Sequence, residues 1–177
     1  MKKKLETAYG VIGLGRFGAA LAMMLAQSGN EVIAVDRDEK KVKEMRQYTD
    51  CAFVTDDLSS DTLKEIGIQN CDVVIICIGE KVDVSVLTTM SVIELGVPRV
   101  IAKALSPEQG AVLGKLGAEV VYPERDMALR LGKKLLSNNF LEYVSLCNQV
   151  EIRQIRDWKE HRRDRDSPQI PTEYYCY

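Results

Sequence analysis

The chain has 177 residues, the size of one typical domain. Hydrophobic residues make up 46% and charged residues 28%, values that exclude a disordered or collagen-like chain. The formal net charge is −2, from 24 basic and 26 acidic residues, which argues against a nucleic-acid binder held by its overall field.

Neither a membrane span nor a signal peptide is expected. The longest uncharged stretch, 17–30, has 14 residues, whereas a span needs about 20 mostly apolar ones. No apolar segment or cleavage site follows the basic start at 1–6. We therefore expect a cytoplasmic protein.

The cysteine pattern predicts reduced, buried thiols, because the number of cysteines is odd and no C-x-x-C pair occurs. The cysteines are Cys51, Cys71, Cys77, Cys147 and Cys176. The only histidine, His161, lies in a charged segment near the end of the chain, which disfavours a metal cluster.

Short β-branched runs alternate with longer amphipathic runs. The expected strands span 8–14, 31–36, 51–55, 72–78, 99–103 and 119–122. The expected helices span 17–28, 38–48, 60–66, 84–95, 107–117 and 123–136. The apolar run within 72–78 is typical of a central parallel strand covered on both faces. This alternation predicts an α/β fold, a Rossmann-like doubly wound six-stranded parallel sheet in a single domain.

The end of the chain has a different composition. In 156–166, nine of eleven residues are charged, and no apolar periodicity runs through the segment. The six positive and six negative charges of 151–177 cancel, which argues against a nucleic-acid arm. We expect the ordered domain to cover 1–145 and 146–177 to form a poorly ordered linker or charged tail.

Gly13-Leu14-Gly15-Arg16-Phe17-Gly18 fits the pattern G-x-G-x-x-G, after the first expected strand and at the start of a helix. In this context the pattern predicts a nucleotide phosphate loop. Gly13 permits the tight turn, Gly15 lets the backbone approach phosphates, and Gly18 lets the helix pack on the sheet. Free N–H groups at the helix start attract an anion. The alternative is a glycine-rich turn that serves packing alone.

Charged residues in and after this loop extend the predicted site. Asp36 ends the second expected strand, where it would accept hydrogen bonds from a ribose diol and repel a 2′-phosphate, which disfavours NADP. Arg37 either pairs with such a phosphate or is a solvated turn residue. Arg16 offers charge-assisted bonds to a polyphosphate or to a phosphate across a dimer interface. Its alternative is a solvated arginine, although the helix dipole disfavours a cation there.

Other strand ends supply further candidates. Asp56 and Asp57 follow the third expected strand, where an adenine would lie, and their alternative role is to cap the next helix. Ile78 and Gly79 end the fourth, where Gly79 would leave room for the ligand. Lys103 ends the fifth expected strand, where it would act as a base or would contact a charged group of the ligand.

Few catalytic groups are present. The expected domain has no histidine, no Tyr-x-x-x-Lys pair, no G-x-S-x-G elbow and no G-x-x-x-x-G-K-[ST] loop. An enzyme of this class needs a substrate pocket besides a cofactor pocket, and the candidate residues in the sequence suffice for only one pocket. A binding switch is therefore favoured over an enzyme. A small NAD-dependent oxidoreductase and an NADH-binding repressor are the alternatives.

Six segments also resemble one known family: 13–18, 35–36, 67–68, 87–89, 117–118 and 123–124. Together they resemble the RCK (TrkA-N) domain of cytosolic regulators of potassium channels and transporters, and above all the Ktr-type regulatory subunits of bacterial potassium uptake. The likeness covers about residues 7–145. The family's third-strand motif, Gly-Asp/Asn-Ala-Thr/Ser, is replaced here by Thr55-Asp56-Asp57-Leu58.

The resemblance implies a Rossmann-like domain that forms a homodimer, often within an octameric ring, beneath a membrane potassium-transporting subunit. It implies binding of ATP or ADP, with NAD(H) as the alternative found in Trk relatives. Apolar faces in 87–93 or 127–136 are candidates for burial by self-association. The function implied is a cytoplasmic, membrane-peripheral regulatory subunit that gates potassium transport in response to nucleotide. The second ligand domain (RCK-C) usual in the family is not expected in this chain.

The resemblance also implies roles by position. The three loop glycines would hold phosphates and Asp36 the ribose, while Asp56 would lie at the adenine. Arg16 would reach a terminal phosphate, that of a neighbour's nucleotide, and sense the difference between ATP and ADP. Glu124 matches an acid near the dimer interface that takes part in cation binding.

Overall fold

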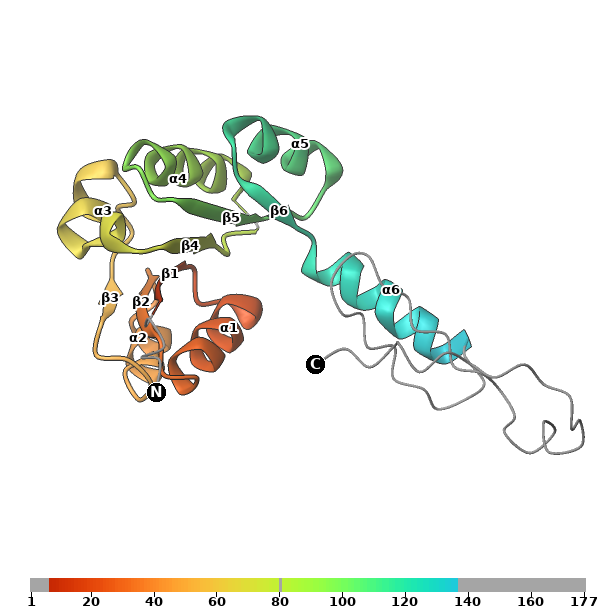
Figure 1. The fold of residues 1–177 in the computed structure, drawn as a ribbon, viewed down its shortest axis with the longest axis horizontal. Coiled ribbons are helices and arrows are strands. Elements are labelled where there is room, and N and C mark those ends of the chain that lie inside the picture. The colour runs from red at the N-terminus through yellow and green to blue at the C-terminus, as the bar shows by residue number, and fades with distance from the viewer. Residues whose placement is uncertain (1–6, 80, 137–177) are drawn as a thin grey trace, which may run out of the picture. The chain divides into compact units, whose positions relative to one another are not determined.

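The structure is a computed structural model that describes residues 7–79 and 81–136. The chain divides into two compact units, 1–130 and 131–177, and the sheet and the site belong to the first. The predicted six-stranded parallel sheet is confirmed, with strand order β3-β2-β1-β4-β5-β6 (Figure 1). Its strands are β1 (Ala8–Ile12), β2 (Glu31–Asp36), β3 (Ala52–Val54), β4 (Val73–Ile76), β5 (Arg99–Lys103) and β6 (Glu119–Val121).

The helices follow the strands in alternation, each within two residues of its predicted start. They are α1 (Arg16–Gln27), α2 (Glu39–Met45), α3 (Ser60–Ile66), the short 3-10 helix η1 (Ile68–Asn70), α4 (Val82–Glu94), α5 (Pro107–Leu116) and α6 (Pro123–Leu136). The predicted cap of α5 is confirmed, because the Ser106 side chain accepts a hydrogen bond from the Gln109 N–H and Pro107 is the first helical residue. Gly117 ends that helix with φ of 104°, a left-handed conformation that favours glycine.

Two layers of helices cover the sheet. Helices α1 and α2 lie on one face, and α3, α4 and α5 lie on the other (Figure 1). Successive strand residues point to opposite faces, so Val11 packs in the cluster that includes Ala22 of α1 and Val42 of α2. Its neighbour Ile12 packs in the second cluster, with core residues of α3, α4 and α5. This double burial explains the apolar strands of a parallel sheet.

The order of the strands in the sheet indicates where a ligand would bind. From β1 the chain moves to β2 and β3 on one side, then crosses to β4, β5 and β6 on the other. Ligands of open α/β sheets bind outside the carboxyl ends of the strands at such a switch point, here between β1 and β4. The residues that follow the strands at this edge include Gly13, Thr55, Cys77 and Ala104.

The cysteine prediction is confirmed at two positions and wrong at a third. Cys71 and Cys77 are buried, whereas Cys51 is exposed at the start of β3. Burial raises the pKa of the Cys71 thiol to about 11, with a smaller contribution from the negative charge of Asp72. Burial raises the pKa of the Cys77 thiol to about 12. Both thiols are therefore protonated at neutral pH and are poor nucleophiles.

Some sequence predictions concern parts of the chain without a described structure. The predicted tail, 146–177, lies outside the described residues, as do Cys147, Cys176 and His161. Within 7–79 and 81–136, no helix has the length and hydropathy of a membrane span.

Candidate functional site

The glycine loop connects β1 to α1 in a tight turn. The Gly13 N–H donates to the Val35 carbonyl oxygen at 2.7 Å, and Gly13 has φ of 99°. A Cβ added to Gly18 would lie 2.0 Å from the Gly13 carbonyl oxygen and 3.0 Å from Cys77 Cβ. A Cβ on Gly15 would meet no atom of the described residues within 4 Å. The loop is closely packed at Gly13 and Gly18 and open to solvent at Gly15.

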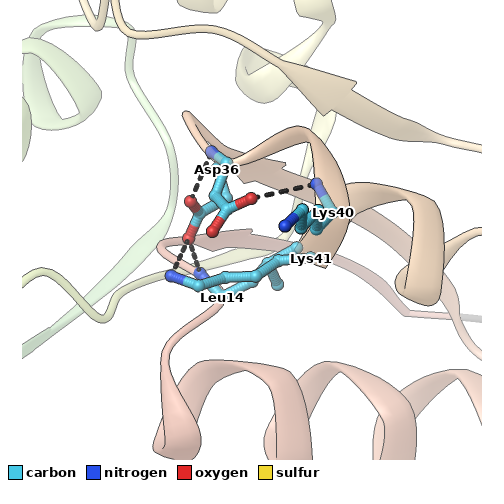
Figure 2. A network of polar contacts seen from close by, with 5 residues as sticks. Leu14, Asp36, Lys40 and Lys41 are labelled. Atoms are coloured by element: carbon cyan, nitrogen blue, oxygen red, sulfur yellow. Dashed lines mark hydrogen bonds and ion pairs between the residues drawn. The ribbon is translucent and has the colours of Figure 1, made fainter.

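Asp36 joins this loop to the end of β2 (Figure 2). Its Oδ2 atom accepts a hydrogen bond from the Leu14 N–H at 2.6 Å, and its Oδ1 atom accepts one from the Asp38 N–H at 2.8 Å. Lys41 Nζ lies 3.5 Å from the same Oδ2 atom, while the Asp36 side chain is only 8% exposed. The predicted ribose acceptor therefore also orients the loop.

The three loop residues other than glycine have different surroundings. Leu14 is buried in the cluster beneath α1, and Phe17 packs against that cluster while half-buried. Arg16 is exposed at the first position of α1, where no acidic side chain of the first helical turn offsets its charge.

An ion pair lies at the same edge of the sheet as the glycine loop, at the end of β5. Lys103 at the end of β5 forms an ion pair with Glu124 at the start of α6, with 2.6 Å between Nζ and Oε1. The hydrogen bond from Lys103 lowers the pKa of Glu124, and the positive charge of Arg16 contributes further. Glu124 is thus under the electrostatic influence of two other predicted site residues, Lys103 and Arg16.

Glu124 was predicted as a cation ligand. In this chain its carboxylate is paired with Lys103, whose side chain is only 13% exposed. Within the described parts of the chain, no three or more His, Cys, Asp or Glu side chains gather as a metal site would require. A cation on Glu124 remains a prediction that requires ligands from another chain, from a nucleotide or from water.

The two acids after β3 differ. Asp57 accepts hydrogen bonds from the Ser59 N–H at 3.0 Å and from the Thr62 hydroxyl at 2.5 Å, and it also bonds to the Ser59 hydroxyl. These bonds, that from Thr62 first, lower the pKa of Asp57. Ser59 in turn caps α3. Asp57 thus binds the turn that contains the capping residue Ser59, which is in keeping with the structural role given as its alternative, whereas Asp56 is exposed at the sheet edge.

The remaining predicted residues occupy the same edge. Ile78 is half-buried and packs against the core beneath α3, α4 and α5. A Cβ on Gly79 would lie 3.2 Å from Leu105 Cδ1, so part of the room predicted for a ligand is taken by this side chain. Arg37 is exposed in the turn after β2.

Sequence reasoning did not single out Lys41. It lies in the first turn of α2, three residues after the capping residue Asp38. Side chains of a helix lean toward its amino end, which directs Lys41 back to the end of β2. The sequence signal was a lysine in the first turn of the helix that follows the ribose-binding acid.

Comparisons with known proteins point to one family of domains. The family model described as the TrkA-N domain matches residues 9–123. Ktr system potassium uptake protein C of Bacillus subtilis (strain 168) is 41% identical over 152 residues, which cover 85% of this chain and 69% of that protein. Ktr system potassium uptake protein A of the same organism is 36% identical over 145 residues, with coverages of 81% and 65%. The chain spans about two thirds of the length of these curated relatives.

Two solved structures of GsuK, which are similar to this chain in fold, are bound to nucleotides. GsuK bound to ADP is 26% identical with a TM-score of 0.61, and the match covers 75% of this chain and 35% of that one. The GsuK channel bound to NAD is 25% identical with a TM-score of 0.62, with coverages of 76% and 24%. The family model and the two Ktr relatives confirm the family resemblance drawn from the sequence.

Proposed function

The chain belongs to the TrkA-N domain family, and we propose that it is the nucleotide-binding part of a regulatory subunit that gates a membrane potassium transporter. The observation that carries the proposal is the glycine loop, anchored through Leu14 to Asp36 at the switch point of the sheet. Two Ktr potassium uptake proteins are similar over most of this chain, which favours gating over a small NAD-dependent oxidoreductase. The proposed domain covers 1–145 and lies at the inner face of the membrane through its partner.

The proposed ligand is ATP or ADP. Its phosphates lie over Gly15 and the start of α1, its ribose diol lies at Asp36, and its adenine lies toward Asp56. NAD(H) is the second candidate, because the GsuK structures show that one protein of this fold takes both ADP and NAD. Both ligands share the adenosine diphosphate moiety that these residues would bind.

The proposed switch depends on charge near the terminal phosphate. ATP has one phosphate more than ADP, and Arg16 at the start of α1 and Lys103 at the end of β5 are the cations proposed to respond to it. A phosphate on Lys103 would compete with Glu124, and the released carboxylate would be free to hold a cation. A nucleotide shifts the transporter only by its differential affinity for two states of the assembly.

Self-association is part of the proposal. Leu87 and Met90 of α4 and Met127 and Leu129 of α6 expose large apolar side chains, as the predicted association surfaces require. A homodimer, or an octameric ring built from dimers, would bury them. It would also bring Arg16 of one copy toward the nucleotide of another.

The test is thermal melting of the purified chain with ATP, ADP, NAD, NADH or no ligand. A ligand at a hundredfold excess over Kd stabilises the native state by about 2.7 kcal/mol. ATP or ADP is expected to raise the melting temperature most. A shift with NADH alone would favour a Trk-like role, and no shift with any nucleotide would contradict the proposal.

Arg16→Ala is expected to weaken ATP binding about tenfold and ADP binding less, since one charge-assisted hydrogen bond is worth roughly that much. Calorimetric titration of both nucleotides measures the difference. Arg46→Ala is the matched control, because Arg46 is an exposed arginine at the end of α2, away from the loop. Equal losses for ATP and ADP would show that Arg16 does not sense the terminal phosphate.

Asp56→Asn and Asp57→Asn are expected to separate binding from folding. Asp57→Asn should lower the melting temperature at neutral pH and leave nucleotide affinity unchanged, because its carboxylate is bonded within its own turn. Asp56→Asn should weaken nucleotide binding and leave the melting temperature unchanged.

The pH dependence of melting checks the Asp57 prediction. The pKa of Asp57 is lower in the folded protein than its ordinary value near 3.8. Its stabilisation is therefore fully present above that value and is lost as the pH falls through the lowered pKa. The difference in melting temperature between Asp57→Asn and the wild type should shrink below pH 3.8. A difference that persists unchanged in acid would show that the carboxylate charge plays no part.

A further inference from the structure

Lys41 forms an ion pair with the carboxylate that the proposed ribose needs as its acceptor. A carboxylate has about four lone-pair positions for hydrogen bonds. On Asp36, one is used by the Leu14 N–H and one by the Asp38 N–H, and Lys41 Nζ lies 3.5 Å from Oδ2 (Figure 2). A ribose diol brings two hydroxyl donors to this carboxylate. We expect the Asp36 carboxylate to accept hydrogen bonds from both hydroxyls only when the Lys41 ammonium group moves away from Oδ2.

The two partners of this ion pair differ in mobility. The Asp36 side chain is 8% exposed and is held by two backbone N–H groups, so it stays in place. The Lys41 side chain is 43% exposed and extends from the surface of α2. Its ammonium group can therefore move into water without disturbing the loop, since it is the part of the pair that is not fixed by backbone contacts.

We propose that Lys41 is an internal competitor of the ribose, whose ammonium group covers Asp36 in the empty site and must be displaced by the diol. This inference rests on the proposed nucleotide site. An ion pair with one well-exposed partner stabilises weakly, so the competition is expected to reduce affinity about two- to fivefold. Lys41 thus lowers the affinity for ligands that carry a ribose diol without contacting the phosphates.

The experiment is calorimetric titration of ADP and of 2′,3′-dideoxy-ADP into the wild type, Lys41→Met and Lys40→Met. Methionine keeps a long apolar stem and removes the charge. Lys40 is the matched control, because it precedes Lys41 on α2 and its removal changes the net charge equally. The dideoxy nucleotide lacks both hydroxyls and has no reason to displace Lys41. Lys41→Gln is the second variant should the methionine variant fold poorly.

The expected result is that Lys41→Met binds ADP about two- to fivefold more tightly than Lys40→Met does, while both bind the dideoxy nucleotide alike. Unchanged or weaker ADP binding in Lys41→Met would overturn the proposal, since the lysine would then be neutral or a ligand contact. An equal gain for both nucleotides would also overturn it, because the effect would not involve the diol. Failure of the wild type to bind any nucleotide would instead refute the proposed function itself, and this inference with it.

Discussion

Gly15→Ala is expected to abolish nucleotide binding without changing the free energy of unfolding. Gly15 has φ of −71° and ψ of −174°, which alanine adopts without strain. The added Cβ would meet no atom of the described residues within 4 Å, so the empty protein accepts it. A phosphate at the start of α1 would meet that Cβ, because this glycine is the point of closest approach between backbone and pyrophosphate.

Melting with and without ADP measures both parts of this expectation. The Gly15→Ala variant should melt at the wild-type temperature without ligand. With ADP at about a hundredfold excess over the wild-type Kd it should show no shift, which corresponds to a loss of at least about a thousandfold in affinity. If the variant still showed the full ADP shift, the phosphates would lie elsewhere and the assignment of the loop would be wrong.

Gly18→Ala is expected to destabilise the fold itself, by about 3 kcal/mol or more. The new Cβ would lie 2.0 Å from the Gly13 carbonyl oxygen, a backbone atom in a turn fixed by the Gly13 N–H bond to Val35. It would also lie 3.0 Å from the Cβ atom of Cys77, the residue that follows β4. Because neither neighbour is the free end of a flexible side chain, α1 must move away from the sheet.

Urea denaturation measures this loss, with Gly114→Ala as the control. Gly114 lies within α5, where an added Cβ makes only an ordinary contact, 3.9 Å from Val120 Cγ2. Alanine there should stabilise by up to about 1 kcal/mol, because glycine is a poor helix former. A Gly18→Ala variant as stable as the wild type would show that the loop does not pack as described.

Together the two loop variants separate structure from ligand binding. Gly18 is expected to be required by the contact between α1 and the sheet, whereas Gly15 is expected to be required only by a ligand. A glycine-rich turn that served packing alone would tolerate Gly15→Ala in every assay.

The fold could be predicted from the sequence because each element carries its own signal. The apolar run of β4 and the Ser106-Pro107 start of α5 are local features, and both are confirmed. The ends of the strands were predicted less accurately. The first strand was predicted to reach residue 14, but β1 ends at Ile12 because Gly13 turns the chain with φ of 99°.

The site was predictable only where its parts are close in sequence or defined by topology. The glycine loop and Asp36 belong to one β-α-β unit and were found together. The packing of Leu105 against Gly79 and the approach of Lys41 to Asp36 depend on side-chain directions across separate elements. The sequence placed Asp57 either at the adenine or in the turn before the next helix, and its hydrogen bond with the Thr62 hydroxyl, five residues further along the chain, could not be foreseen from the sequence.

The central claim is that an adenine nucleotide binds at the loop between β1 and α1. Calorimetric titration of ADP, ATP, NAD and NADH into the wild-type chain, repeated with Gly15→Ala, tests it most directly. The account predicts saturable binding of ATP or ADP, with one site per chain, that disappears in Gly15→Ala. Binding that survives in Gly15→Ala, or no binding of any of the four nucleotides to the wild type, would contradict it.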